Sequence, residues 1–254
     1  MVRGLLAILA VTLIAPQGGF AQAKELHVAA AADLTPVMPM LAEAYEHATG
    51  VKVIASFGSS ATLAQQLENG DPQDVFLSAD FVHPEELVAA GLTVEKTPLL
   101  YARGVLVLWA RKDSPAQPMS IDSLTRPGVE KIAVANELHA PYGVAATRAI
   151  EHLGLTAKLK SKLVVAENIT QTAQFVESGN AQVGFISMTI ARSQHFVEVG
   201  SYVRVPDVYP DIQQCAVVMK TAKDPSMALD FVRWLTTKEV QASLKKMGLD
   251  PIDR

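Results

Sequence analysis

The stretch Ser56-Phe57-Gly58-Ser59-Ser60-Ala61-Thr62 joins an apolar strand, residues 51–55, to an amphipathic helix that begins near Ala61. Such a junction directs the free N–H groups of the helix start toward whatever lies above it. Gly58 lets a ligand approach closely, and the serine hydroxyls add donors beside the positive end of the helix dipole. The stretch predicts an anion-binding turn made without Lys or Arg, although the same serines also suit an ordinary helix cap.

Short β-rich runs alternate with helical patterns along most of the chain. Strands are predicted at residues 26–30, 51–55, 75–78, 105–110, 132–135, 163–165, 183–186 and 215–219. Helices are predicted at 36–47, 61–68, 84–89, 143–153 and 169–178, with a closing pair within 226–247. Several strands are apolar on both faces, which indicates mostly parallel α/β sheets covered by helices. Ligands of such sheets bind at the carboxyl ends of the strands, where the helices begin.

The alternation is interrupted near residues 99–103 and again at 205–214, which contains Pro206 and Pro210. Two interruptions with α/β units on each side predict that the chain crosses to a second lobe and later returns. The first lobe would comprise residues 24–103, the second lobe residues 104–210, and the returning segment with the C-terminal helices residues 211–254. The two lobes would flank a cleft.

The beginning of the chain has the pattern of a cleavable signal peptide. Arg3 precedes an apolar run, residues 5–15, and Ala21-Gln22-Ala23 has the small-x-small form of a cleavage site. The run is shorter than the roughly 20 residues that span a bilayer. Residues 1–23 are therefore predicted to be removed, leaving a periplasmic protein with no membrane insertion. The net charge of −4 argues against nucleic acid as a partner.

Three other strand-to-helix junctions resemble the one at Gly58: residues 29–33, 139–143 and 167–171. Two of the four junctions lie in each predicted lobe. If both pairs converge, a small anion would be held from two sides by helix dipoles and neutral hydrogen bonds.

The segments 29–33, 56–63, 74–80, 139–143 and 167–184, in this order, resemble those of the periplasmic molybdate-binding proteins of ABC importers. The similarity extends over essentially the whole predicted mature chain. It implies a two-lobed type II periplasmic binding protein fold that closes on a tetrahedral oxyanion, molybdate or tungstate. It further implies a monomer that is not an enzyme, uses no cofactor and delivers its ligand to a membrane permease.

The resemblance also implies which residues contact the ligand. The first-lobe contacts fall on Asp33 and Ser60, with Ser59 beside them. The second-lobe backbone contacts fall on Tyr142 and Ile169, and the position that carries a ligand-touching Tyr in well-known members falls on Ser187. The hydroxyl of Tyr142 is one candidate to replace that Tyr.

Asp33 raises an electrostatic problem, because an ionised carboxylate and a deprotonated oxyanion both only accept hydrogen bonds. At about 4 Å and an effective dielectric constant of about 20, each unit of ligand charge is repelled by roughly 4 kcal/mol. Three solutions are open. Asp33 turns away as the N-cap of the following helix, it accepts a proton-bearing oxygen of the ligand, or it pairs with a cation such as Arg103.

Two other functions follow from the same residues. A phosphate-like or sulfate-like ligand would be favoured if Asp33 faces the site. A secreted serine hydrolase would use Ser60, but it needs a base within hydrogen-bond reach, and the sequence offers none. The six histidines and one cysteine show neither His-x-x-x-His nor Cys-x-x-Cys spacing, so no metal-cation site is predicted.

Overall fold

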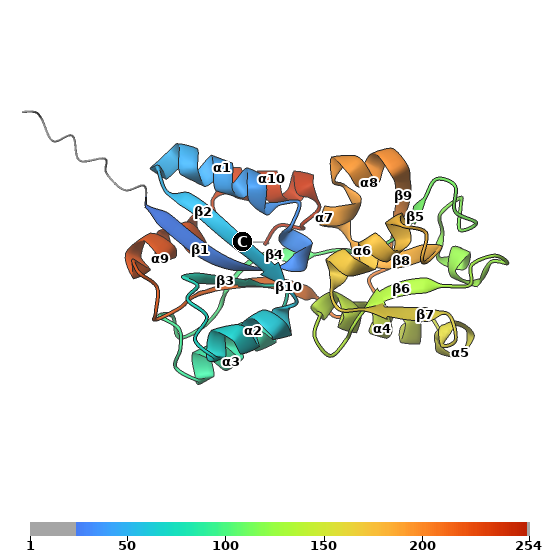
Figure 1. The fold of residues 1–254 in the computed structure, drawn as a ribbon, viewed down its shortest axis with the longest axis horizontal. Coiled ribbons are helices and arrows are strands. Elements are labelled where there is room, and N and C mark those ends of the chain that lie inside the picture. The colour runs from blue at the N-terminus through green and yellow to red at the C-terminus, as the bar shows by residue number, and fades with distance from the viewer. Residues whose placement is uncertain (1–23, 253–254) are drawn as a thin grey trace, which may run out of the picture.

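The chain forms two lobes, each built around a five-stranded sheet flanked by helices (Figure 1). The structure, a computed structural model, describes residues 24–252, so the predicted signal peptide, residues 1–23, lies outside the described residues. The strand order is β2-β1-β3-β10-β4 in the first lobe and β7-β6-β8-β5-β9 in the second. The prediction of a two-lobed, mostly parallel α/β fold is confirmed.

The first lobe contains both ends of the described chain. Strand β1 pairs in parallel with β2 and β3, and β10 is antiparallel to β3 and β4. Its elements are β1 (Glu25–Ala31), the 3-10 turn η1 (Ala32–Leu34), α1 (Met38–Thr49), β2 (Lys52–Gly58), α2 (Ser60–Glu68), β3 (Val75–Ser78), α3 (Val82–Ala89), β4 (Leu99–Gly104), β10 (Ile212–Val218), α9 (Pro225–Trp234) and α10 (Lys238–Met247).

The second lobe is inserted between β4 and β10. Strand β6 is parallel to β7 and β8, whereas β5 is antiparallel to β8 and β9. Its elements are β5 (Leu106–Arg111), η2 (Ile121–Thr125), β6 (Ile132–Ala135), α4 (Pro141–His152), α5 (Thr156–Leu159), β7 (Leu163–Ala166), α6 (Ile169–Glu177), β8 (Val183–Ser187), α7 (Met188–Ala191), α8 (Gln194–Val199) and β9 (Gly200–Arg204).

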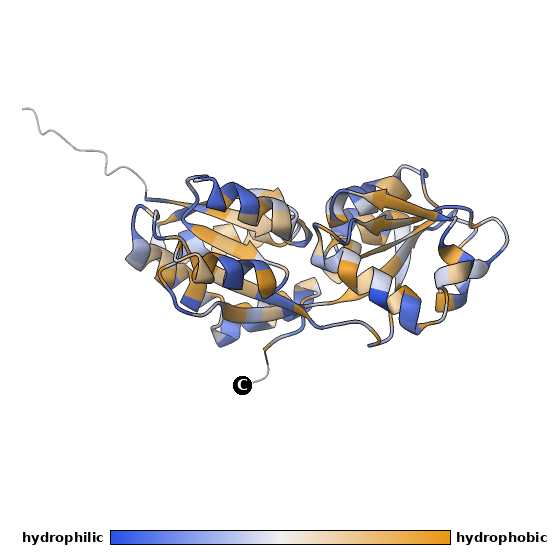
Figure 2. Ribbon diagram, turned by 90° about the horizontal axis from the view of Figure 1, so that it is seen from below, coloured by the Kyte–Doolittle hydropathy of each residue, from blue (hydrophilic) through white to orange (hydrophobic). Residues whose placement is uncertain are grey.

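Each lobe has its own apolar core between sheet and helices. Strands of both lobes are hydrophobic, while the outward faces of the helices are hydrophilic (Figure 2). In the first lobe, Leu26 and Val28 of β1 share a core with Phe231 of α9, and in the second lobe Trp109 and Phe185 are fully buried. Burial of such side chains contributes about 1.5 to 3 kcal/mol each, so each lobe has a stable frame for the loops between the sheets.

The chain crosses between the lobes twice, at Val105 between β4 and β5 and at residues 205–211 between β9 and β10. The predicted interruption at residues 99–103 is wrong, because this segment is strand β4 and pairs with β10. The predicted interruption at 205–214 is too long, since β10 already begins at Ile212. The lobe boundary predicted after Pro210 falls in the second crossing, and the one predicted after Arg103 falls one residue before the end of β4.

Gly104 lies at the first crossing, where the backbone of β4 approaches the second lobe. A Cβ atom at this position would overlap the hydroxyl oxygen of Tyr142 and lie 2.7 Å from Cγ2 of Ile212. We therefore expect Gly104→Ala to lower the free energy of unfolding by roughly 1 to 3 kcal/mol through overpacking. Urea unfolding followed by circular dichroism measures this change.

A double-mutant cycle tests the cause. In a Tyr142→Phe background the hydroxyl oxygen is gone, so Gly104→Ala should cost less than in the wild type. Equal costs in the two backgrounds would show that the added methyl group does not press on the Tyr142 hydroxyl.

Candidate functional site

The four junctions predicted from the sequence meet between the two lobes around one small cavity. Three segments of the first lobe and two of the second form its wall. The lining residues are Ala31, Ala32, Asp33, Gly58, Ser59, Ser60, Ala79, Ala140, Pro141, Tyr142, Asn168 and Ile169. The turn η1, which carries Asp33, packs against α6 and α7 of the second lobe (Figure 1).

Three helices begin at this cavity. Ser60 and Ile169 are the first residues of α2 and α6, and Tyr142 is the second residue of α4. Amide groups in the first turn of a helix have no intrahelical partner, and the helix dipole adds positive partial charge. None of the lining residues is Lys or Arg. The cavity is therefore suited to a small anion held by neutral donors.

Ser59 and Ser60 have different roles at the start of α2. Ser59 is the N-cap: its Oγ accepts a hydrogen bond from the Thr62 amide at 3.4 Å and lies 2.6 Å from the Thr62 hydroxyl. The Oγ of Ser60 accepts a hydrogen bond from the amide of Ala79 at 3.1 Å. Because that bond uses only a lone pair, the hydroxyl hydrogen of Ser60 remains able to donate to a ligand.

Asp33 is 1% exposed, and one of its two carboxyl oxygens accepts hydrogen bonds from two side chains. The Oδ2 atom accepts a hydrogen bond from the Tyr142 hydroxyl at 3.0 Å and another from Nε2 of Gln214 at 2.6 Å. The Oδ1 atom is buried and has no hydrogen-bond partner within the described residues. Burial raises the pKa of Asp33 to about 7, although the bonds from Tyr142 and Gln214 partly oppose this.

Two of the three solutions proposed for Asp33 are wrong. Asp33 is not an N-cap, because it lies inside η1 and the residue that precedes α1 is Val37. Arg103 does not neutralise it, since the Arg103 Nε atom pairs with Oδ2 of Asp211 at 2.9 Å. Neutral donors, Tyr142 and Gln214, bind the carboxyl instead.

The structure brings five of the seven predicted site residues to the cavity: Asp33, Ser59, Ser60, Tyr142 and Ile169. Arg103 and Ser187 do not line it. The Ser187 hydroxyl is used locally, because its Oγ caps α7 by accepting from the amide of Ile190 and lies within hydrogen-bond distance, 2.8 Å, of the hydroxyl oxygen of Thr189.

Sequence reasoning missed Gln214 and Thr189. Gln214 is fully buried in β10 beside the half-buried Gln213, and a glutamine directly before the apolar run 215–218 is the signal that could have identified it. Thr189 donates a 2.7 Å hydrogen bond to the backbone oxygen of Asp33, and no pattern around it in the sequence indicates this contact.

Hydrogen bonds across the cleft hold the lobes together. Besides the bonds of Tyr142 and Thr189 to Asp33, the Thr170 hydroxyl donates to the oxygen of Ala32 at 3.0 Å. The amide of Ala61 donates to the oxygen of His139 at 3.2 Å. The structure is thus a closed form, and three of these four bonds end on η1.

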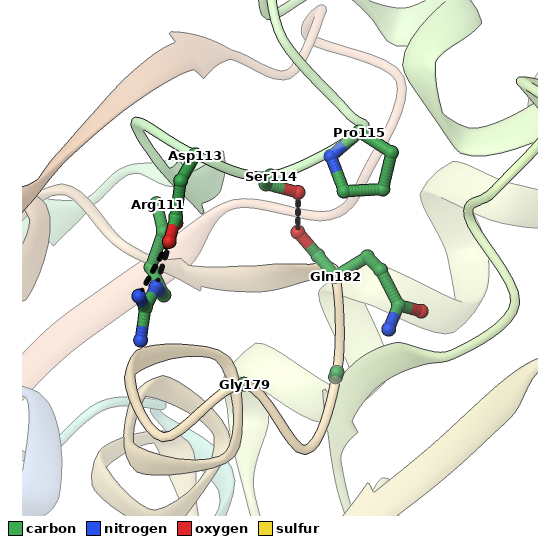
Figure 3. Close-up of a pocket in the computed structure, with 7 residues that line it drawn as sticks. Arg111, Asp113, Ser114, Pro115, Gly179 and Gln182 are labelled. Carbon is green, nitrogen blue, oxygen red and sulfur yellow. Dashed lines mark hydrogen bonds and ion pairs between the residues drawn. The ribbon is translucent and has the colours of Figure 1, made fainter.

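A larger cavity of about 260 Å³ lies at the outer end of the second lobe (Figure 3). Its polar groups already bind one another: Arg111 pairs with Asp113 at 2.6 Å, and the Ser114 hydroxyl donates to the oxygen of Gln182 at 2.6 Å. It contains no group directed at a ligand, so its size alone does not make it a site.

The described residues give no support to a serine nucleophile with a base. Ser78 and His83 both bind Asp80, at 3.0 and 2.7 Å, so the serine and the histidine share a carboxylate and are not joined to each other. The Ser60 hydroxyl binds a backbone amide, that of Ala79. Within residues 24–252, no group of three or more His, Cys, Asp or Glu side chains is placed to hold a metal ion.

Comparison with known proteins agrees with the fold. The family model for bacterial extracellular solute-binding proteins matches residues 26–250. The chain is 39% identical over 233 residues to a molybdate-binding protein of Azotobacter vinelandii, covering 90% of each chain. It is 34% identical over 229 residues to that of Rhodobacter capsulatus, covering 90% of this chain and 89% of the other.

A solved structure has the same architecture. The structure titled as the periplasmic molybdate-binding protein of Azotobacter vinelandii superposes with a TM-score of 0.81 at 32% identity. The match covers 90% of this chain and 100% of the other.

The raised pKa of Asp33 predicts that the free energy of unfolding depends on pH. The unfolded chain ionises this carboxyl above about pH 4, whereas the folded protein keeps the proton up to about pH 7. The contribution of the neutral carboxyl to stability is therefore complete at low pH and is lost as the pH rises through 7. Relative to Asp33→Asn, the wild type should lose roughly 2 to 3 kcal/mol between about pH 5 and pH 8.

Urea unfolding of both ligand-free proteins at several pH values gives this difference. The exposed Asp122→Asn change, which removes the same charge, should show no such pH-dependent difference from the wild type. A constant difference between wild type and Asp33→Asn would mean that Asp33 is ionised throughout this range.

Proposed function

Since the chain belongs to the bacterial extracellular solute-binding proteins, we propose that it binds molybdate or tungstate between its lobes and delivers the anion to an ABC importer. The observation that carries this proposal is the convergence of three helix N-termini and the Ser60 hydroxyl on one cavity without a cationic side chain. The named function of the relatives supports the choice of oxyanion.

Neutral donors replace the water around the anion in this proposal. The backbone amides at Ser60, Tyr142 and Ile169 and the hydroxyl of Ser60 act as donors, and Asp33 completes the wall. Ser187 acts indirectly, because it binds Thr189, which in turn holds the backbone of Asp33. Closure of the lobes excludes water, which strengthens every one of these electrostatic contacts.

The size of the cavity supports a small inorganic ligand. Sites for organic ligands of drug size enclose about 300 to 1,000 Å³, whereas the free space of this cavity in the closed structure is about 10 Å³. Molybdate and tungstate have the same charge and nearly the same size, so both belong to the proposal.

The same reasoning extends to the cellular role. We propose a binding protein that is not an enzyme and acts as a monomer in the periplasm after removal of residues 1–23. The relatives named as binding proteins and the periplasmic source stated for the solved structure support this. Among residues 24–252, no helix is both long and apolar enough to cross a membrane.

Calorimetric titration with molybdate, tungstate, sulfate and phosphate tests the ligand. Molybdate and tungstate should bind with dissociation constants of about 1 μM or below, which corresponds to roughly −8 kcal/mol, and the other anions more weakly. If neither molybdate nor tungstate binds in this range, the proposed function is wrong. Tighter binding of phosphate or sulfate would reassign the ligand.

The neighbouring serines provide a matched pair of variants. Ser60→Ala removes a donor to a charged ligand, which is worth about 1.5 to 3 kcal/mol, so the dissociation constant should rise roughly 10- to 150-fold. Ser59→Ala removes a helix cap with the same change in size, and it should lower stability; because the Ser59 hydroxyl is already bound to Thr62, the dissociation constant should rise less than in Ser60→Ala. Similar losses of affinity in both variants would argue against a direct contact of Ser60.

A further inference from the structure

Asp33 differs from the other lining residues because it is an ionisable group in a cavity that suits an anion. An ionised Asp33 would repel a dianion and would offer it no hydrogen. The contacts of this carboxyl show where a proton can reside.

Hydrogen bonds fix the roles of the two carboxyl oxygens. The Tyr101 hydroxyl donates to Oε1 of Gln214 at 3.1 Å, which orients the amide of Gln214 so that Nε2 donates to Oδ2 of Asp33. The Tyr142 hydroxyl donates to the same Oδ2 atom. An oxygen that already accepts two hydrogen bonds is a poor place for a proton, so the proton of a neutral Asp33 belongs on Oδ1.

The Oδ1 atom is also the buried carboxyl oxygen that has no partner within the described residues. A buried donor or acceptor without a partner is costly, and a fully deprotonated oxyanion can only accept hydrogen bonds. A protonated Oδ1 and an oxyanion oxygen therefore satisfy each other, whereas an ionised Oδ1 and the anion do not.

We propose that the oxyanion and one proton bind together, and that the Oδ1 atom of Asp33 carries this proton and donates it in a hydrogen bond to the ligand. The inference rests on the proposed function, because it concerns the same cavity. Above neutral pH the proton is taken from the solvent on binding and is returned to it on release.

The other side chains near Asp33 provide the ligand with neither a positive charge nor a proton. Tyr142 of α4 and Tyr101 of β4 are the titratable side chains in this network, and burial, followed by the nearby Asp33 charge, raises the pKa of each well above its usual range. The remaining hydrogen bonds to η1 from these elements come from neutral groups: Gln214 of β10 and Thr189 of α7 bind Asp33, and Thr170 of α6 binds the oxygen of Ala32. Both tyrosines stay neutral across the working pH range.

His139 is the titratable group at the rim that needs a control. It is partly exposed, its ring Nδ1 lies 3.0 Å from a carboxylate oxygen of Glu167, and the next residue, Ala140, lines the cavity. Protonation of His139 would also attract an anion. The variants Asp33→Asn and His139→Gln separate the two sources of protons.

Calorimetry in buffers of different ionisation enthalpy counts the protons taken up with molybdate. At about pH 8.5 the wild type and His139→Gln should each take up close to one proton, and uptake should fall toward zero at about pH 5.5, where Asp33 is already protonated. The dissociation constant of the wild type should rise about tenfold per pH unit above neutrality.

The Asp33→Asn variant should bind molybdate without proton uptake, because its amide group donates at any pH. Its dissociation constant should vary less than about threefold between pH 5.5 and 8.5. Asp33→Ser, which also offers a neutral donor, should behave in the same way. Agreement between the two variants would show that the result does not come from misfolding of one of them.

Two results would overturn the inference while leaving the proposed function intact. One is molybdate binding by the wild type at about pH 8.5 without proton uptake. The other is uptake that persists in Asp33→Asn or disappears in His139→Gln. Absence of molybdate binding by every variant at every pH would instead overturn both the function and the inference.

Discussion

The bond between the Tyr142 hydroxyl and the buried carboxyl of Asp33 joins the two lobes at the cavity itself. This bond can form only when both lobes have folded, because Tyr142 lies in the first turn of α4 in the second lobe and Asp33 follows β1 in the first. Gln214 fixes the same carboxyl from β10, and Gly104 leaves room for the tyrosine hydroxyl at the crossing. This arrangement requires neutral partners for the carboxyl. A lysine or arginine at this place would pair with the carboxyl and would compete there with the bound anion.

Anion binding without a cation has a physical advantage in a closed cleft. A buried lysine or arginine would need a counter-charge whenever the ligand is absent, and leaving such a charge unpaired is costly. Helix N-termini carry only partial charges, which the surrounding dipoles stabilise at all times. The ligand-free protein can therefore close without burying an unpaired cation at α2, α4 or α6.

The sequence predicted the parts of this site that local patterns encode. The small and polar residues after β1, β2, β6 and β7 indicated four anion-binding junctions, and the alternation of strands and helices indicated that they would meet at strand ends. The hydrogen bonds of Asp33 could not be predicted in this way, because its partners Tyr142 and Gln214 lie 109 and 181 residues away in the sequence. Strand β9 and helix α7 were missed for a different reason: they are short, and β9 is largely exposed, so neither has a clear hydrophobic period.

The four hydrogen bonds that cross the cleft join protein to protein and contain no ligand atom. Part of the free energy of closure is therefore intrinsic to the chain. These bonds favour the closed form even when no ligand is bound. A ligand shifts that population only by the difference between its affinities for the two forms. A membrane partner that recognised lobe closure alone would accept empty carriers, so productive transport requires the bound anion to add stability beyond these four bonds.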